Sequence, residues 1–118
     1  MRILGFSVKW GKLDRMVFTS FRFPRKDKDW AVGEQVQIVY KPRTKGREIL
    51  GIAEIITKEE RWIFTGKKLR GSKVLTLQEA HEDGFKSHVE MAMWLSKAHG
   101  HDRCVNEAMN KLTLRWAN

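Results

Sequence analysis

The sequence predicts one α+β domain spanning residues 1–118, in which helices pack against a curved or barrel-like sheet. Strand patterns fill the first half of the chain, two helix patterns follow them, and a strand pattern ends the chain. Because the helices are grouped and do not alternate with the strands, a doubly wound sheet is excluded. With 118 residues, 42% of them hydrophobic, the chain can bury one core and is too short for a second.

The strands are predicted from β-branched and aromatic residues and from alternating polarity. Residues 3–8 form a short first strand, and residues 13–23 form a longer one that ends at Pro24, which cannot continue a hydrogen-bonded ladder. A polar loop follows. The remaining strand predictions are 35–40, which alternates apolar and polar residues, 48–57, which is apolar enough to be buried on both faces, 60–65, and the closing strand 112–116.

Helices are predicted over 77–83 and 88–99. Each begins with a hydroxyl residue followed three positions later by glutamate, which is the spacing of a capping box. Each is also followed by a glycine that can end it. The buried face of the second helix is predicted to consist of Met91, Trp94, Leu95 and Ala98.

The chain is strongly basic. It has 23 Lys and Arg against 14 Asp and Glu, a formal charge of +9 and a pI near 10.0. Residues 1–50 hold 12 of the basic and only 5 of the acidic side chains, so a polyanionic partner is predicted to bind mainly this half. Three basic clusters lie at predicted loops: Arg22, Arg25, Lys26 and Lys28; Lys41, Arg43, Lys45 and Arg47; and Lys67, Lys68, Arg70 and Lys73.

Aromatic residues lie among these clusters, namely Phe21, Phe23, Trp30 and Tyr40. Positive charge combined with flat faces for stacking is typical of proteins that bind single-stranded or looped RNA. RNA is therefore the predicted partner, with DNA or a protein as alternatives. The opposing interpretation is that the charged loops are only solvated and the aromatics belong to the core, which is what we predict for Trp94 and Trp116 because both lie on apolar stripes.

Common enzyme motifs are absent from the sequence. There is no GxxxxGK[ST], GxGxxG, GxSxG or HExxH, which disfavours the large nucleotide-hydrolysing and hydrolase superfamilies. His99, His101 and Cys104 have a spacing similar to that of zinc ligands, but no second ligand cluster accompanies them. No metal and no cofactor is predicted.

A cytoplasmic location is predicted, without a membrane partner. No apolar run is long enough to span a bilayer, and the first residues lack the pattern of a secretory signal peptide. The single cysteine cannot form an internal disulfide, which agrees with a reducing compartment.

Three segments resemble, in order, motifs of the ASCH domain family, a member of the PUA-like superfamily. Residues 18–22, Phe-Thr-Ser-Phe-Arg, resemble the end of its GxKxxTxR signature; residues 30–34 resemble its W-x-V-G-[DE] turn, and residues 83–87 its D-G-F-x-S step between two helices. The resemblance covers residues 6–116. It implies a β-barrel of five or six strands with two helices packed against it, a cleft near the signature strand, and RNA binding.

The signature is incomplete at the position most important for catalysis. Aligning Arg22 with its final arginine places Ser20 on the threonine and Val17 on the lysine. In deacylating members of the family that lysine is proposed to activate the hydroxyl, and valine carries no proton. A hydroxyl without a base is a weak nucleophile at neutral pH, so the leading prediction is a binding module. The alternative is a ribonuclease or an N4-acetylcytidine-type amidohydrolase, whose candidate residues are Ser20 or Thr19 with Lys12, Glu54 or Glu79.

The predicted binding site centres on Arg22, with Thr19 and Ser20 beside it. A forked guanidinium suits a phosphate or a base carbonyl, and the alternative role for Arg22 is an ion pair with Asp29 or Glu34. The predicted rim consists of Trp30 and the loops 24–28, 41–47 and 67–73.

Overall fold

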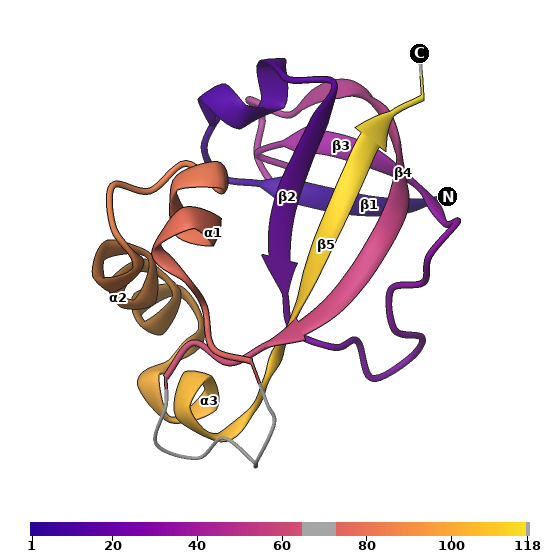
Figure 1. Ribbon diagram of the computed structural model, residues 1–118. Coiled ribbons are helices and arrows are strands. Elements are labelled where there is room, and N and C mark those ends of the chain that lie inside the picture. The colour runs from indigo at the N-terminus through magenta and orange to yellow at the C-terminus, as the bar shows by residue number, and fades with distance from the viewer. Residues whose placement is uncertain (65–72, 118) are drawn as a thin grey trace.

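Five strands form one mixed sheet, as shown in Figure 1 by a computed structural model that describes residues 1–64 and 73–117. The strand order is β1-β3-β4-β5-β2; β1 and β3 are parallel, and the other neighbours are antiparallel. The strands are β1 (Arg2–Phe6), β2 (Val17–Arg22), β3 (Gln35–Tyr40), β4 (Glu48–Arg61) and β5 (Met109–Trp116). The α+β class is therefore confirmed.

The strand β3 has the predicted bounds, whereas β4 differs from the prediction. Residues 48–61 form one strand of 14 residues in place of two shorter ones. The first half of β4 pairs with β3 and the second half pairs with β5, so the polar stretch 57–60 is held in the ladder by its new partner. The sequence shows that residues 57–60 are polar, but it does not show that β4 changes its pairing partner from β3 to β5. For this reason the sequence predicts two strands with a break between them.

The backbone ladders leave the sheet open, with β1 and β2 at its two edges among the described residues. The sheet is strongly twisted, and β1 and β3 run across behind β2 and β5 (Figure 1). A side chain joins the two edges, because the Arg22 guanidinium on β2 donates a hydrogen bond of 2.7 Å to the Gly5 carbonyl on β1. The cleft described below lies at this junction.

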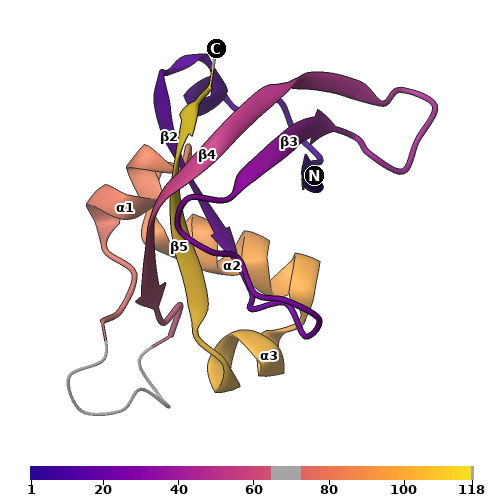
Figure 2. The same ribbon diagram turned by 90° about the vertical axis from the view of Figure 1, so that its right-hand side faces the viewer.

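All the α-helices lie together on one side of the sheet, and the β3–β4 hairpin projects away from them (Figure 2). The first two predicted helices are confirmed with nearly the same bounds, and a third was missed. Thr76 and Glu79 form the predicted capping box with both bonds present, while at Ser87 only the hydroxyl bond to the Glu90 amide is present. The helices are a 3-10 turn η1 (Gly11–Asp14), α1 (Leu77–Glu82), α2 (His88–His99) and α3 (His101–Asn106).

Helix α3 is not among the helices that the sequence predicts. It has six residues and begins without a side-chain cap, so it lacks the signals that reveal a helix in a sequence. Its Cys104 is completely buried and packs in the core that α1 and α2 share with the sheet. Tertiary packing therefore supplies the stability that local capping does not.

Two hydrophobic clusters make up the core, and they correct two predictions about tryptophans. One cluster joins the helices to the sheet around Phe21, Phe85 and Met91, and the other lies within the curve of the sheet around Leu4 and Ile38. Trp30 is only 3% exposed and belongs to the second cluster, so its predicted place on an RNA-binding rim is wrong. Trp94, predicted as core, is 41% exposed. Trp116 packs against the core as expected.

Arg2 fastens the first strand to the loop between β2 and β3. Its guanidinium donates to both carboxylate oxygens of Glu34, at 2.7 and 2.6 Å, and lies 4.4 Å from the centroid of the Trp30 ring. Glu34 is therefore not the partner of Arg22, and Asp29 is paired with Lys58 at 2.8 Å. Among the described residues, no helix has the length and apolar character needed to span a membrane.

The Arg2–Glu34 pair predicts a loss of stability in acid. The hydrogen bonds from Arg2 hold the pKa of Glu34 below its ordinary value. The carboxylate therefore contributes stability above its unfolded pKa of about 4.3, and this contribution is lost as the pH falls through the folded pKa. We expect the free energy of unfolding, measured in urea below about pH 5, to fall less steeply for Glu34→Gln than for the wild type. Identical slopes would show that the pair contributes nothing.

Candidate functional site

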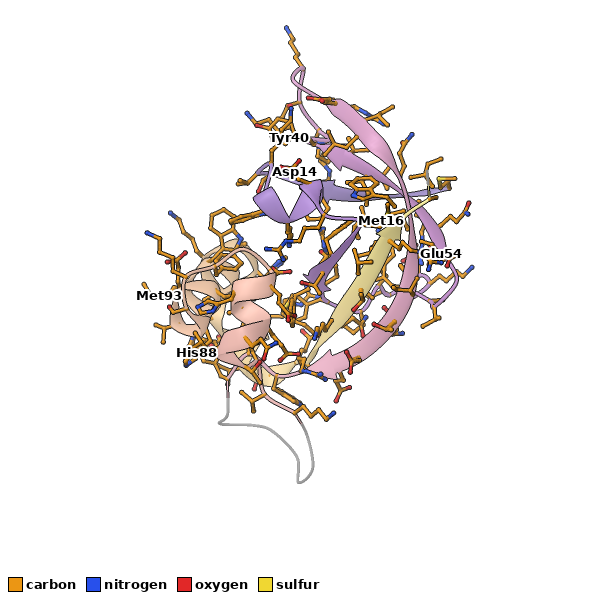
Figure 3. The ribbon with its side chains drawn as sticks, turned by 45° about the horizontal axis from the view of Figure 1, so that its top comes forward. Asp14, Met16, Tyr40, Glu54, His88 and Met93 are labelled. Atoms are coloured by element: carbon orange, nitrogen blue, oxygen red, sulfur yellow. The ribbon has the colours of Figure 1, made fainter. Side chains whose placement is uncertain are left out.

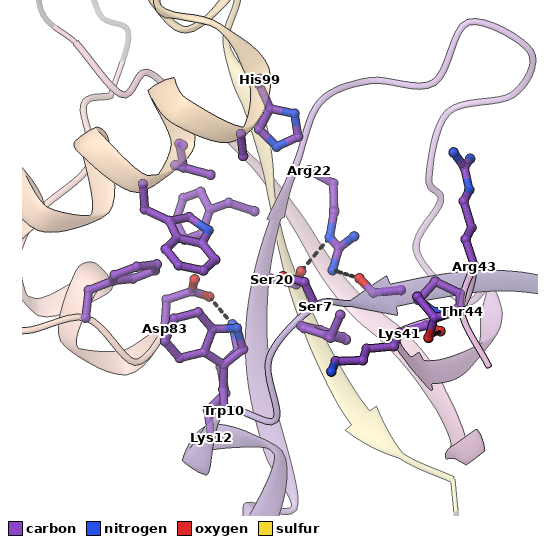
Figure 4. Close-up of a pocket in the computed structure, with 18 of the residues that line it drawn as sticks. Ser7, Trp10, Lys12, Ser20, Arg22, Lys41, Arg43, Thr44, Asp83 and His99 are labelled. Carbon is purple, nitrogen blue, oxygen red and sulfur yellow. Dashed lines mark hydrogen bonds and ion pairs between the residues drawn. The ribbon is translucent and has the colours of Figure 1, made fainter. Parts of the chain in front are cut away.

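A cleft of about 880 Å³ opens where β1, β2, the β3–β4 turn and α2 meet (Figure 4). Its volume is in the range of sites that enclose a small ligand, roughly 300 to 1,000 Å³. Ser20 and Arg22 lie between two different walls: Trp10 and Asp83 are on one side, and Lys41, Arg43 and Thr44 are on the other (Figure 4). The two walls offer different chemistry.

The helix-side wall is aromatic. The Trp10 ring lies 5.0 Å from that of Phe85 and 5.4 Å from that of Trp94, between ring centroids. Gly84 permits this packing, because it has a positive φ of 107° and a Cβ at this position would lie 3.1 Å from the Trp10 ring. Trp94 keeps part of its ring exposed to the cleft, so it offers a stacking face.

The hairpin-side wall is cationic. Lys41, Arg43 and Lys45 all line the cleft from the turn between β3 and β4, and all three side chains are exposed. The Thr44 hydroxyl donates a hydrogen bond of 3.0 Å to the Lys41 carbonyl and stabilises the turn. Together with Lys12 and Arg22, these residues give the lining five basic side chains against one acidic side chain, Asp83. The cleft therefore attracts anions.

Arg22 lies at the floor of the cleft without a carboxylate partner. Its Nε donates to the Ser20 hydroxyl at 2.8 Å, its Nη2 donates to the Gly5 carbonyl at 2.7 Å, and the guanidinium lies 4.8 Å from the Phe6 ring centroid. No acidic side chain of residues 1–64 and 73–117 forms an ion pair with it. Some of the side chain reaches the cleft, but protein atoms surround the guanidinium, and this desolvation lowers the pKa of Arg22 to about 10. At neutral pH the Arg22 guanidinium therefore remains positively charged.

A buried polar cluster lies beside Arg22 and joins three elements. The Lys12 ammonium on η1 and the Thr19 hydroxyl on β2 both donate to Oδ1 of Asp83, at 2.8 and 2.9 Å, and Asp83 caps the end of α1. All three side chains are buried. Burial lowers the pKa of the Lys12 ammonium and raises the pKa of the Asp83 carboxyl, against the attraction between the two charges.

The structure brings several of the predicted site residues together. Lys12, Ser20 and Arg22 line the cleft together with Lys41, Arg43 and Lys45 of the second basic cluster. Thr19 joins the buried polar cluster. Asp83 was not predicted as a functional residue, although it begins the D-G-F-x-S segment. The sequence does not reveal that the end of α1 packs onto β2, so its carboxylate could not be placed.

Other predicted residues lie elsewhere. Glu54, on β4, forms an ion pair with Arg115 at 3.6 Å and lies on the opposite side of the molecule from His88 and Met93 of α2 (Figure 3). It does not line the cleft, so its candidate catalytic role is wrong. Glu79 instead binds Arg61 and Lys111, each at 2.8 Å.

The other members of the first basic cluster do not join Arg22 at the cleft. Arg25, Lys26 and Lys28 are exposed on the loop before β3, and they are not among the residues that line the cleft. The predicted contacts of Lys67, Lys68 and Arg70 fall outside the described residues.

The histidines and the cysteine with metal-like spacing have separate packing partners. The His99 ring lies against Phe23 and the His101 ring against Phe64, with centroids 5.2 and 5.1 Å apart. Cys104 is buried, and burial raises the pKa of its thiol. In the part of the chain that the structure describes, no three His, Cys, Asp or Glu side chains are grouped so that they could hold a metal ion.

Comparisons with protein-family models, with curated proteins and with solved structures found no match to this chain. The function must therefore be inferred from the chemistry of the cleft.

Removing one member of the buried ion pair is expected to destabilise the fold more than removing both. Asp83→Leu leaves the Lys12 ammonium without its partner, and such changes cost about 3 to 5 kcal/mol. Adding Lys12→Met removes the stranded charge, so the double variant should recover part of that loss. Urea unfolding of both single variants and the double variant at pH 7 measures the coupling. Strictly additive losses would contradict it.

Proposed function

We propose that this protein is a PUA-like module of the ASCH type that binds RNA or a nucleotide-containing ligand in the cleft. The observation that carries the proposal is Arg22, a desolvated guanidinium with no carboxylate partner among the described residues, at the floor of a cleft with a basic wall. Burying a charge without an ion-pair partner is unfavourable. A phosphate on the ligand would compensate the charge, and a base carbonyl could accept a further hydrogen bond.

The two walls support a nucleotide ligand in particular. Lys41, Arg43 and Lys45 supply charges for phosphate groups, and Trp94 on the opposite wall supplies an exposed ring for a base. Proteins that bind single-stranded nucleic acid commonly combine these two features. An acidic peptide could bind the basic wall, but its carboxylates would not use the exposed Trp94 ring on the aromatic wall.

The positions of the three motif segments support the ASCH type. Residues 18–22 lie on the edge strand β2 at the cleft, residues 30–34 lead directly into β3, and residues 83–87 connect α1 to α2. These are the places that the resemblance implies for them. The PUA-like barrel is part of the proposal, and the twist that brings β1 and β2 together at Arg22 supports it.

Arg22→Gln should weaken binding without weakening the fold. A charge-assisted hydrogen bond contributes about 1.5 to 3 kcal/mol, so we expect at least a tenfold rise in Kd for a labelled single-stranded RNA measured by fluorescence anisotropy. The thermal midpoint should stay the same or rise, because a desolvated charge is removed. Arg115→Gln, on the exposed face of β5, is the matched control and should bind like the wild type. Equal affinity of both variants would refute the proposed site.

A hydrolase acting on RNA or modified nucleosides is the second candidate. It is favoured by the buried Lys12–Asp83 pair, because burial moves the pKa values of the two groups toward each other and so eases proton transfer near the Ser20 and Thr19 hydroxyls.

Incubation with RNA and with N4-acetylcytidine separates the two candidate functions. We expect both compounds to remain intact, as required of a binding module. Turnover that disappears in Ser20→Ala or Thr19→Ala, while RNA binding persists, would instead establish the hydrolase.

A further inference from the structure

We propose that the cleft holds a terminal phosphate, the phosphomonoester of a strand end or of a free nucleotide, in preference to a phosphodiester in the middle of a strand. This inference rests on the proposed function. It concerns which part of a nucleic acid or nucleotide reaches Arg22, and it follows from the tight packing at the floor of the cleft, the distribution of charge and the position of the exposed Trp94 ring.

The floor is tightly packed around Arg22. The guanidinium is tied to β2 through Ser20 and to β1 through the Gly5 carbonyl. On β1, Gly5 is packed so closely against Pro42 of the hairpin turn that a Cβ on Gly5 would lie 2.7 Å from the proline ring. These contacts pack the edge strands and the turn tightly together at the floor of the cleft. A phosphodiester on Arg22 would have to fit a nucleoside on each side of this floor, whereas a terminal phosphate brings only one.

The charge at this end of the cleft suits a dianion. A phosphomonoester carries about −1.5 to −2 charges near neutral pH, and a phosphodiester carries one. Arg22 lies at the floor, and Lys41 and Arg43 line the adjoining wall (Figure 4). More than one cation is therefore available to a single phosphate. The second negative charge of a phosphomonoester would be paired with one of these cations.

The opposite wall accommodates one nucleoside. Trp94 is the exposed ring of the aromatic cluster, while Phe85 is buried and Trp10 is partly buried beneath it. Among the described residues that line the cleft, no other tryptophan or phenylalanine ring is exposed, and the exposed His99 ring already packs edge-on against Phe23. The inferred ligand is therefore a phosphate on Arg22 with its own nucleoside against Trp94.

The test compares oligoribonucleotides of one sequence that carry a 5′-phosphate, a 3′-phosphate or hydroxyls at both ends. Each competes with a labelled single-stranded RNA for the wild-type protein. We expect one phosphorylated form to bind at least tenfold more tightly than the hydroxyl form. Arg22→Gln should remove that preference, and Arg115→Gln should keep it. Because the comparison is made on the wild type, it holds even if Arg22→Gln fails to fold.

Nucleoside monophosphates identify the source of the phosphate. Competition by the 5′- or 3′-monophosphate, and not by the nucleoside, would point to a free nucleotide. A preference shown only by the oligonucleotides would point to a strand end. Equal binding of all three oligonucleotides would overturn this inference and leave the proposed function standing. No binding by any of these compounds would overturn both.

Discussion

The buried ion pair between Lys12 and Asp83 is the interaction on which the cleft depends. It fixes the 3-10 turn to the end of α1, and the Thr19 hydroxyl ties both to β2. Because Trp10 precedes Lys12 and Gly84 follows Asp83, the same contact sets the aromatic wall against β2. Replacing a buried ion pair with apolar residues often leaves stability unchanged or raises it. Apolar residues would not, however, place an ammonium and a carboxylate in the same cleft as Arg22, as this pair does.

Arg22 and Lys12 show two different ways of holding a charge inside a protein. Lys12 has a carboxylate at 2.8 Å, so its charge is compensated within the fold. Among the described residues, Arg22 donates hydrogen bonds to a hydroxyl and a carbonyl, which carry no net charge, and Asp83 attracts it without forming an ion pair. A cation that is only partly compensated lowers stability, and such local departures from the most stable arrangement are expected at functional sites. This contrast supports the proposal that Arg22 binds an anion, whereas Lys12 is paired within the fold.

The sequence was informative where the signal is local and uninformative where it depends on packing. Alternating polarity located β3, and the hydroxyl-to-glutamate spacing located the starts of α1 and α2. The exchange of partners along β4, the burial of Trp30 and the exposure of Trp94 all depend on contacts distant in the chain. The candidate site shows the same division. Arg22 and the 41–47 turn were predicted from residue type, and the structure brings Arg22 to one cleft with Lys41, Arg43 and Lys45. The positions of Lys12 and Asp83 depend on a contact that spans 71 residues.

The net charge of the chain does not show where an anion would bind. The local distribution of charge, however, favours the cleft. Residues 25–29 contain Asp27 and Asp29 among their basic side chains, and Arg25 is paired with Asp27 at 3.3 Å. Residues 41–47 contain four basic side chains and no acidic one. The field of the first segment is therefore largely cancelled at short range, while that of the second adds to the field of Arg22 across the cleft. A polyanion that approaches the N-terminal half is thus directed toward the turn and the floor beneath it.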